Sequence, residues 1–217
     1  MPDSDPGDLR DPDELGDPAE LRGALVVLAP VTRHHVVDLR RILATPHVRA
    51  RWGDEAASDR WPFDDPSATR FAILLGGVVR GMVQFGEEAE PAYRHASIDI
   101  FVDPAVHGRG VGRDAVRTLA RHLIADRGHH RLVIDPAADN KAAIRCYAAV
   151  GFRPVGVMRR YERNVDADGW HDGLLMDLLA DELDLGQQTR RCWCSPDRGE
   201  HGGCGRGFLS IQGPARQ

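Results

Sequence analysis

The sequence predicts one mixed α/β domain at residues 23–185, built on about seven strands. Three observations support this fold class. Short apolar runs bounded by glycine, proline or aspartate recur along the chain, as expected for strands. Longer segments between them carry apolar residues at helical spacing. A glycine-rich loop joins one predicted strand to one predicted helix, which is a common setting for an anion site.

The predicted strands are short and rich in aliphatic residues. Residues 71–75 and 78–85 are expected to form a hairpin, because Gly76 and Gly77 between them can adopt the positive φ angles of a tight turn. A polar excursion that contains Trp170 is expected to join the last two strands. The remaining predicted strands are residues 25–30, 97–102, 131–134, 154–158 and 174–179.

Three helices are predicted between the strands. The first follows Thr32, a residue type that caps helix N-termini, and is expected to end at Pro46. The second covers residues 113–125 and places one apolar face against the sheet, and the third covers residues 142–149. Residues 47–68, which carry several aromatic and acidic side chains, are expected to form a surface flap.

The two ends of the chain lack hydrophobic periodicity. Residues 1–22 are rich in Asp, Pro, Gly and Glu, and residues 186–217 in Gly and Arg, so we expect both to be disordered tails. Three cysteines and a histidine near the C-terminus could hold zinc, but their spacing differs from that of typical zinc ligands, and we predict no metal site. These residues are Cys192, Cys194, His201 and Cys204.

Composition and charge limit the possible partners. The 217-residue chain is 42% hydrophobic, and none of its apolar runs approaches the roughly 20 residues that cross a bilayer. Its start lacks the basic and apolar regions of a secretory signal, which predicts a cytoplasmic protein without a membrane partner. A formal charge of −5 argues against a general nucleic-acid binder. The same charge suits a small cationic partner, although it is also common among soluble proteins.

The segment from His107 to Gly112 predicts an anion-binding loop. Its glycines at alternate positions let the backbone approach a bound group closely. The first N–H groups of the following helix have no partner within that helix, and the helix dipole places partial positive charge there, which suits a phosphate or pyrophosphate. A dinucleotide-binding loop would carry a third glycine where Arg113 stands, and a P-loop would continue with GK[ST], so neither pattern fits.

Three segments together resemble the GCN5-related N-acetyltransferase (GNAT) superfamily. The loop matches the family's pyrophosphate pattern Q/R-x-x-G-x-G/A as His107-x-x-Gly110-x-Gly112, with histidine in place of glutamine or arginine. Residues 98–104 are similar to the family's fourth strand, and residues 140–152 to its N-x-x-A-x-x-x-Y-x-x-x-G-F segment. The three matches follow one another in the family's order.

The resemblance implies the GNAT fold, a mixed and mostly antiparallel sheet with helices on both faces. It also implies that the fourth and fifth strands of that fold, here residues 97–102 and 131–134, splay apart and admit the pantetheine arm of acetyl-CoA, the co-substrate. Groups from the splayed strand, the loop and two helices would then hold acetyl-CoA. These residues are Ile100, Phe101, Val102, His107, Gly108, Arg109, Gly110, Val111, Gly112, Arg113, Asn140 and Ala143. For Asn140, capping of its helix is a second role that does not exclude the first.

Asp99 is the main candidate for acid–base chemistry. Strand alternation puts Asp99 and Phe101 on one face and Ile98 and Ile100 on the other. A carboxylate in such a strand either makes a structural hydrogen bond or faces a wet pocket, where it could anchor an alkylammonium group and accept its proton. The resemblance implies a second catalytic residue, Tyr147, whose hydroxyl would protonate the departing CoA thiolate. Packing at the sheet edge is the alternative role for this tyrosine.

Further residues are expected near the acceptor. Asp135 follows a predicted strand and either faces the acceptor or serves as the turn residue before Pro136. Trp52 is either a wall for a sugar ring or a core anchor. Glu87 and Glu88 are each typical of solvated surface, but together they are expected to rim a site that attracts a polycation.

Within the family, the segments around Trp52, Asp99, Asp135 and Tyr147 are most similar to the aminoglycoside 6'-N-acetyltransferases. This implies transfer of acetyl to the 6'-amine of an aminoglycoside, and hence antibiotic resistance. Ribosomal-protein N-terminal and siderophore-lysine acyltransferases share many of these features. A regulatory CoA-binding module without catalysis is a further alternative, suggested by His107. Both a monomer and a homodimer are consistent with the sequence.

Overall fold

The computed structural model describes residues 19–53, 58–165 and 168–184. Eight strands form one sheet in the order β1-β2-β3-β4-β5-β6-β8-β7. Neighbouring strands are antiparallel except β5 and β6, which are parallel, so the predicted mixed and mostly antiparallel sheet is confirmed. The strands are β1 (Leu21–Arg22), β2 (Val27–Pro30), β3 (Ala68–Leu75), β4 (Val78–Glu88), β5 (His95–Val102), β6 (Arg131–Ile134), β7 (Arg153–Arg163) and β8 (Trp170–Leu179).

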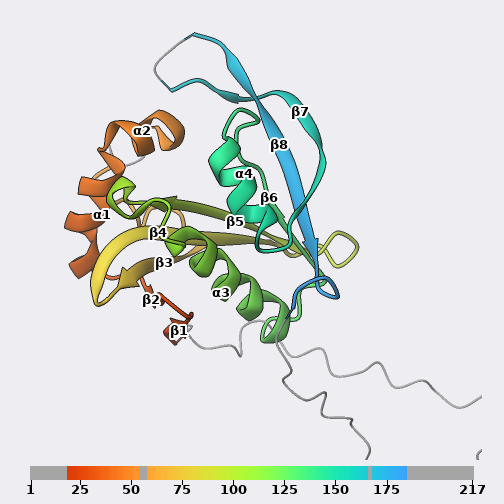
Figure 1. The fold of residues 1–217 in the computed structure, drawn as a ribbon, viewed down its shortest axis with the longest axis horizontal. Coiled ribbons are helices and arrows are strands. Elements are labelled where there is room, and N and C mark those ends of the chain that lie inside the picture. The colour runs from red at the N-terminus through yellow and green to blue at the C-terminus, as the bar shows by residue number, and fades with distance from the viewer. Residues whose placement is uncertain (1–18, 54–57, 166–167, 185–217) are drawn as a thin grey trace, which may run out of the picture. The chain divides into compact units, whose positions relative to one another are not determined.

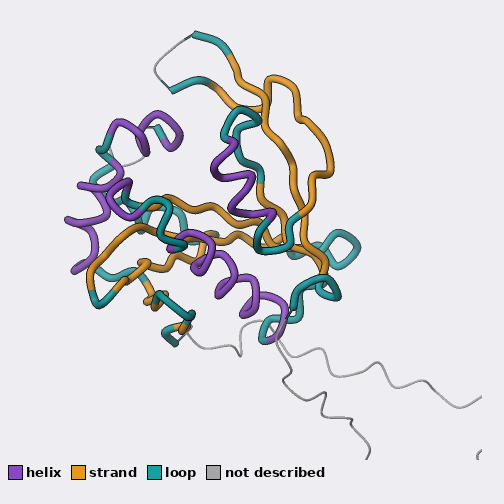
Figure 2. Tube along the Cα trace, in the orientation of Figure 1, coloured by secondary structure: helices purple, strands orange, loops and turns teal. Residues whose placement is uncertain are grey.

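Helices cover both faces of the sheet, as predicted, in two groups that Figures 1 and 2 show apart from each other. The helices are α1 (Val36–Leu43), α2 (Pro46–Trp52), α3 (Val111–Ala125) and α4 (Lys141–Ala148), with short 3-10 helices at Arg33–His35 and Pro104–Val106. Phe85 and Ile98 belong to the core beneath α3 and α4. Met82 and Phe101, which point to the opposite face, belong to the core beneath α1 and α2.

Some elements differ from the sequence prediction. Pro46 does not end a helix but is the first residue of α2, a position that suits proline because its N–H would have no helical partner. Part of the predicted surface flap is therefore helical. Trp170, predicted in a polar excursion, begins β8, because β7 and β8 pair as far as Arg163 and Trp170. Leu21–Arg22 adds a short strand that pairs with β2.

Both predicted tails fall largely or wholly on residues that the structure does not describe. The N-terminal prediction is described only from residue 19, and the C-terminal segment at 186–217, with its cysteines, lies outside the described residues. Within the described part, none of the helices combines the length and the hydropathy of a membrane span.

Asp114, in the first turn of α3, fastens the N-terminal strands to that helix. Its carboxylate accepts hydrogen bonds from the N–H groups of Ala24, Leu25 and Val26 at 3.1, 2.7 and 3.0 Å. The helix dipole favours negative charge at this position. A Cβ at Gly23 would lie 2.5 Å from the Asp114 carboxylate, so any larger residue would displace that side chain. The start of α3, and with it the preceding loop, is thereby fixed to the sheet.

We expect Asp114→Ala to lower the free energy of unfolding by about 2 kcal/mol, because three N–H groups lose a charged acceptor at a partly hydrated site. Urea denaturation followed by circular dichroism measures this change. Arg121→Ala, on the exposed side of the same helix, is the matched control and should change stability by less than about 0.5 kcal/mol. An equally small effect at Asp114 would mean that water replaces the carboxylate.

Candidate active site

β5 and β6 pair only where they begin. Ala96 pairs with Leu132 and Ser97 with Val133, and the pairing stops there. On the other side of β5, pairing with β4 continues as far as Val102. Since backbone groups of a strand point alternately to its two neighbours, those of residues 98–102 that face away from β4 have no partner strand among the described residues. β5 and β6 thus part after Ser97 and Val133, as expected, and we call the stretch where they are unpaired the gap. In Figure 1, β4 and β5 run across the view while β7 and β8 rise to its top.

The loop after β5 leads into an uncapped helix N-terminus. Gly108 and Gly110 have φ angles of +73° and +82°, a region that residues with a Cβ rarely adopt. Gly110 is the N-cap of α3, and the Asp114 N–H is the first to bond back to it, at 3.0 Å. The N–H groups of residues 111–113 therefore precede the helical ladder. With no side chain on either glycine, these donors are arranged in a way that suits a diphosphate, the group that the sequence predicts here.

His107 is tied to β5 and α2. Its Nε2 donates to the carbonyl oxygen of Val102 at 3.0 Å, and its ring meets that of His47 edge-on, with the centroids 5.0 Å apart. Because a carbonyl only accepts, Nε2 carries a proton, and in a neutral ring Nδ1 is then an acceptor. The Nε2–H of His107 is therefore used within the protein and is not free to bind an anion. Diphosphate binding would depend on the backbone N–H groups of the loop.

Asp99 lies beside the gap on the face that α1 and α2 cover only in part. Phe101 is 4% exposed beneath these helices, whereas Asp99 is accessible to solvent. Burial nevertheless raises the pKa of Asp99, a hydrogen bond from Gln84 lowers it, and the charges of two nearby acids raise it again. Asp99 is thus partly desolvated by its neighbours and still accessible to a ligand from solvent.

The two acids that act on Asp99 are Asp135, which follows β6, and Glu162 on β7. Tyr161 stands next to them, and its hydrogen bond to the Asp135 carboxylate raises the pKa of Tyr161 to about 12. The Glu162 carboxylate lies 3.1 Å from Nε2 of His171 on β8. The structure thus brings acids from three strands or their ends to one place. Sequence analysis predicted Asp99 and Asp135 but missed Tyr161 and Glu162.

Tyr147 lies on α4 and is 8% exposed, with its ring edge-on to that of Phe152 at 6.4 Å. Burial raises the pKa of Tyr147, and the charges of Cys146, Asp99 and Asp135 add to this effect. The hydroxyl therefore remains protonated near neutral pH. The charge of Asp99 acts on Tyr147, although Tyr147 packs in the core beneath α3 and α4 and Asp99 lies on the other face of β5.

Asn140 caps α4, one of the two roles expected for it. Its Oδ1 accepts a hydrogen bond from the N–H of Ala143 at 3.1 Å. Because the Ala143 N–H is occupied in this way, that group is not a free donor for a ligand. The role of Asn140 toward the pantetheine arm stays a prediction.

α2 reaches both sides of the gap. Trp52 packs edge-on against Phe101 of β5, with ring centroids 4.9 Å apart, and is only partly buried. Arg51 forms an ion pair of 2.7 Å with Asp139, which lies between β6 and α4. Trp52 thus contributes to the core and also leaves part of its ring exposed, so both roles expected for it are compatible with its position.

Glu87 is placed differently from what the sequence suggested. Arg127 donates two hydrogen bonds to its carboxylate, at 3.0 and 2.6 Å, and His129 lies 2.6 Å from it. Since Glu87 is three residues beyond Gln84 on β4, its side chain points to the opposite face from Asp99. We therefore leave Glu87 out of the acceptor site. Glu88 is exposed at the end of β4, where it accepts a hydrogen bond from the N–H of Glu90.

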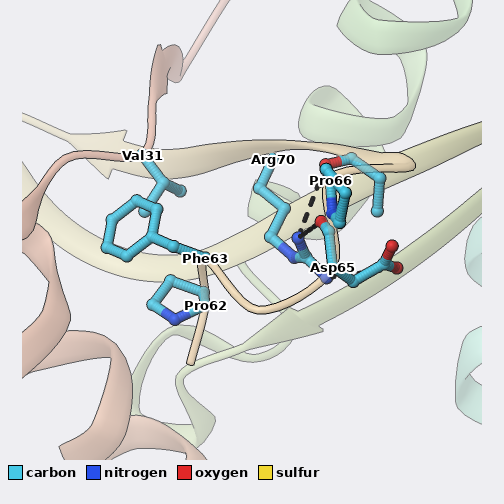
Figure 3. Close-up of a pocket in the computed structure, with 7 residues that line it drawn as sticks. Val31, Pro62, Phe63, Asp65, Pro66 and Arg70 are labelled. Carbon is cyan, nitrogen blue, oxygen red and sulfur yellow. Dashed lines mark hydrogen bonds and ion pairs between the residues drawn. The ribbon is translucent and has the colours of Figure 1, made fainter. Parts of the chain in front are cut away.

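A cavity of about 230 Å³ lies beside β3 (Figure 3). Val31 and Phe63 line one side, and Asp65 and Arg70 the other, with Arg70 donating to the Asp65 carbonyl oxygen at 2.7 Å. Arg70 also donates a hydrogen bond to Gln84, which in turn donates one to Asp99. Among the described residues, no group of three or more metal-ligating side chains could hold a metal ion, and the cysteines expected to be unsuited to zinc lie outside them.

The gap, the loop and the helix that follows it agree with a comparison of sequences. The sequence model of the acetyltransferase (GNAT) family matches residues 36–152. The chain belongs to this family. The match includes β5, the glycine loop, α3 and α4, which are the elements that surround the gap.

Individual relatives of this GNAT chain fall into more than one group. The N-alpha-acetyltransferase RimI of Mycobacterium tuberculosis is 40% identical over 80 residues, 37% of this chain and 48% of that protein. The chain thus spans about half the length of this relative. An aminoglycoside N(6')-acetyltransferase type 1 of Klebsiella pneumoniae is 27% identical over 155 residues, 61% of this chain and 76% of that protein. Mycobacterium smegmatis RimJ in complex with CoA-disulfide has a TM-score of 0.65 and 28% identity, covering 76% of this chain and 87% of that one.

We expect Gly110→Ala to weaken CoA binding about 5- to 30-fold, because a Cβ costs about 1–2 kcal/mol in the left-handed region and the loop would relax away from its binding shape. Isothermal titration calorimetry with CoA measures the effect. Gly128→Ala is the matched control, since Gly128 has a similar φ of +69° but lies beyond the far end of α3. CoA affinities that fall equally in the two variants would contradict a diphosphate site at the loop.

Proposed function

We propose that this protein transfers the acetyl group of acetyl-CoA to a primary amine by direct attack. The observation that carries the proposal is the unpaired edge of β5, with Asp99 beside it and an uncapped helix N-terminus at its end. An extended arm can bind along this edge as a substitute strand, through the backbone groups that β6 leaves free. Membership of the GNAT family supports the same reaction.

In this proposal, acetyl-CoA binds along β5 and at the glycine loop. The edge from Ile100 to Val102 would hold the pantetheine amides and the thioester carbonyl, and an N–H aimed at that carbonyl would stabilise the charge that develops on its oxygen. The N–H groups of the loop and of the first turn of α3 would hold the diphosphate. The thioester supplies the acetyl group, and the protein supplies position and proton transfer.

Asp99 would bind the acceptor as an ammonium ion and take its proton. The freed amine nitrogen then attacks the thioester carbon and a C–N bond forms. The nitrogen, now positively charged, loses its second proton to water, the C–S bond breaks, and sulfur leaves as the CoA thiolate, which regains a proton from water. The raised pKa of Asp99 suits this role, because a stronger base accepts the proton more readily. The Asp99 proton can later pass to solvent, since the carboxyl is accessible.

Tyr147 would meet the thiolate as a hydrogen-bond donor. Burial raises its pKa well above the usual range, so the hydroxyl keeps its proton throughout the working pH range. An ordinary thiol has a pKa of about 8.5, so complete proton transfer from Tyr147 to the thiolate is uphill. Its main contribution would be a donated hydrogen bond to the leaving sulfur, with water completing the protonation.

The acceptor we favour is a small polycation, and specifically the 6'-amine of an aminoglycoside. Asp99, Asp135 and Glu162 lie close enough for their charges to interact, and several ammonium groups on one ligand would neutralise them together. The similarity to an aminoglycoside N(6')-acetyltransferase supports this choice, and antibiotic resistance would be the biological outcome. Protein N-termini are the second candidate, favoured by the similarity to RimI and RimJ.

An acceptor panel tests the proposal. Release of free CoA is measured with a thiol reagent, using kanamycin-type compounds with and without the 6'-amine, a peptide with an N-terminal alanine, and a hydroxamate-type lysine derivative. We expect turnover only with compounds that carry the 6'-amine. Turnover of the peptide alone would move the assignment to protein N-termini. Thermal stabilisation by acetyl-CoA with no turnover of any amine would favour a regulatory CoA-binding module.

We expect Asp99→Asn to lower kcat by about 10²- to 10⁴-fold, the usual contribution of a positioned base, while the affinity for acetyl-CoA changes by less than about twofold. Steady-state kinetics and calorimetric titration measure the two effects separately. Asp126→Asn, an exposed carboxylate at the end of α3, serves as the matched control. Full turnover in the Asp99 variant would remove this residue from the mechanism.

A further inference from the structure

A row of three polar side chains crosses the sheet and ends at Asp99. Arg70 on β3 pairs in register with Gln84 on β4, and Gln84 pairs in register with Asp99 on β5. Directly paired residues on adjacent strands point to the same face of a sheet. The row therefore lies on the face that α1 and α2 cover only in part, next to the cavity in Figure 3.

Arg70 is held rigidly at the outer end of this row. Its guanidinium donates to the carbonyl oxygens of Asp65 at 2.7 Å and Ala68 at 3.4 Å, and it lies 3.7 Å from the Asp65 carboxylate. Only 11% of the Arg70 side chain is exposed. An arginine with this many partners has little freedom to turn, so the direction of its Nε–H is fixed.

The Nε–H of Arg70 determines how the Gln84 amide is oriented. Nε of Arg70 donates to Oε1 of Gln84 at 2.9 Å. Because arginine has donors only, the amide oxygen must face Arg70 and the amide nitrogen must face the other way. The nitrogen donates to Oδ2 of Asp99 at 3.4 Å. Arg70 thus ensures that the nitrogen of the Gln84 amide, and not its oxygen, faces Asp99.

The hydrogen bond from Gln84 acts on the pKa of Asp99 in the opposite direction from the other groups around this residue. Asp135 after β6 and Glu162 on β7 add negative charge, and the hydroxyls of Tyr147 on α4 and Tyr161 on β7 are neutral near neutral pH because their pKa values are raised. Burial acts in the same direction as the two acids. Among the interactions on Asp99, the Gln84 hydrogen bond alone lowers its pKa, so it favours the carboxylate.

We propose that Arg70 and Gln84 are positioning residues that hold Asp99 as a carboxylate turned toward the acceptor, although neither of them touches the substrate. The inference rests on the proposed role of Asp99 in proton transfer. Arg70 and Gln84 lie outside the gap, and they differ from ordinary cross-strand contacts because together they act on Asp99.

The test is the pH dependence of Gln84→Met, a substitution of similar size that removes the donor. The ratio of variant to wild-type kcat/KM with one acceptor cancels the titration of the amine itself. We expect this ratio to be near one at high pH and to fall as the pH is lowered through the titration of Asp99, approaching a loss of about tenfold, as for loss of one hydrogen bond to a charged group. A ratio that is equally low at every pH would mean a structural role and would overturn the proposal.

Two further variants complete the experiment. Ser97→Ala, on the same face of β5 but bonded to Gly86 instead of Asp99, should keep a ratio near one at every pH. Arg70→Met should shift the profile in the same direction as Gln84→Met, because the amide loses the partner that orients it. An unchanged profile in Arg70→Met would remove Arg70 from the proposal.

A measurement without substrate separates this inference from the proposed function. Carbon-13 NMR titration of the aspartate carboxyls follows Asp99 directly, with its signal assigned by its loss in Asp99→Asn. We expect the Asp99 midpoint to move to higher pH in Gln84→Met, and an unmoved midpoint would overturn the inference. Full turnover in Asp99→Asn would instead refute the catalytic role of Asp99, whatever the titration shows.

Discussion

The site depends on the short parallel pairing of β5 and β6. A parallel neighbour cannot follow through a tight turn, so the chain must cross over, and α3 provides that connection. The crossover begins where β5 ends, which puts the N-terminus of α3 at the open end of the gap. One topological feature therefore supplies both an unpaired strand edge and an anion site. The anchoring of α3 by Asp114 keeps the two in a fixed relation.

Binding of an ammonium group and acceptance of its proton place opposite requirements on the pKa of Asp99. A carboxylate that is ionised too easily would hold the ammonium but accept its proton poorly, whereas one crowded by other acids would be protonated and bind no cation. Burial and the neighbouring acids act in one direction, and the Gln84 amide acts in the other. The row from Arg70 to Asp99 is thus a means to set this balance from β3 and β4, which lie on the opposite side of β5 from the gap.

The sequence predicted the elements with strong local patterns and missed those decided by pairing. Alternation in β5 correctly placed Asp99 and Phe101 on one face, and the glycine loop was recognisable from its spacing. The same alternation along β4 could have separated Glu87 from Gln84. Tyr161 and Glu162 carried no such signal, because β7 is exposed along nearly its whole length and shifts register near them. α2 was missed because Pro46 also fits the first position of a helix.

The acid cluster bears on the choice between acceptors. A protein N-terminus brings one ammonium group, which can neutralise one of the three carboxylates Asp99, Asp135 and Glu162 and leaves the other two to repel each other. Tyr161 offsets some of this repulsion by donating to Asp135, and His171 lies against Glu162. A ligand with several ammonium groups would replace these partial compensations by ion pairs. Its binding energy would then favour the charge distribution that Asp99 needs in order to accept a proton, which links recognition of a polycation to the chemical step.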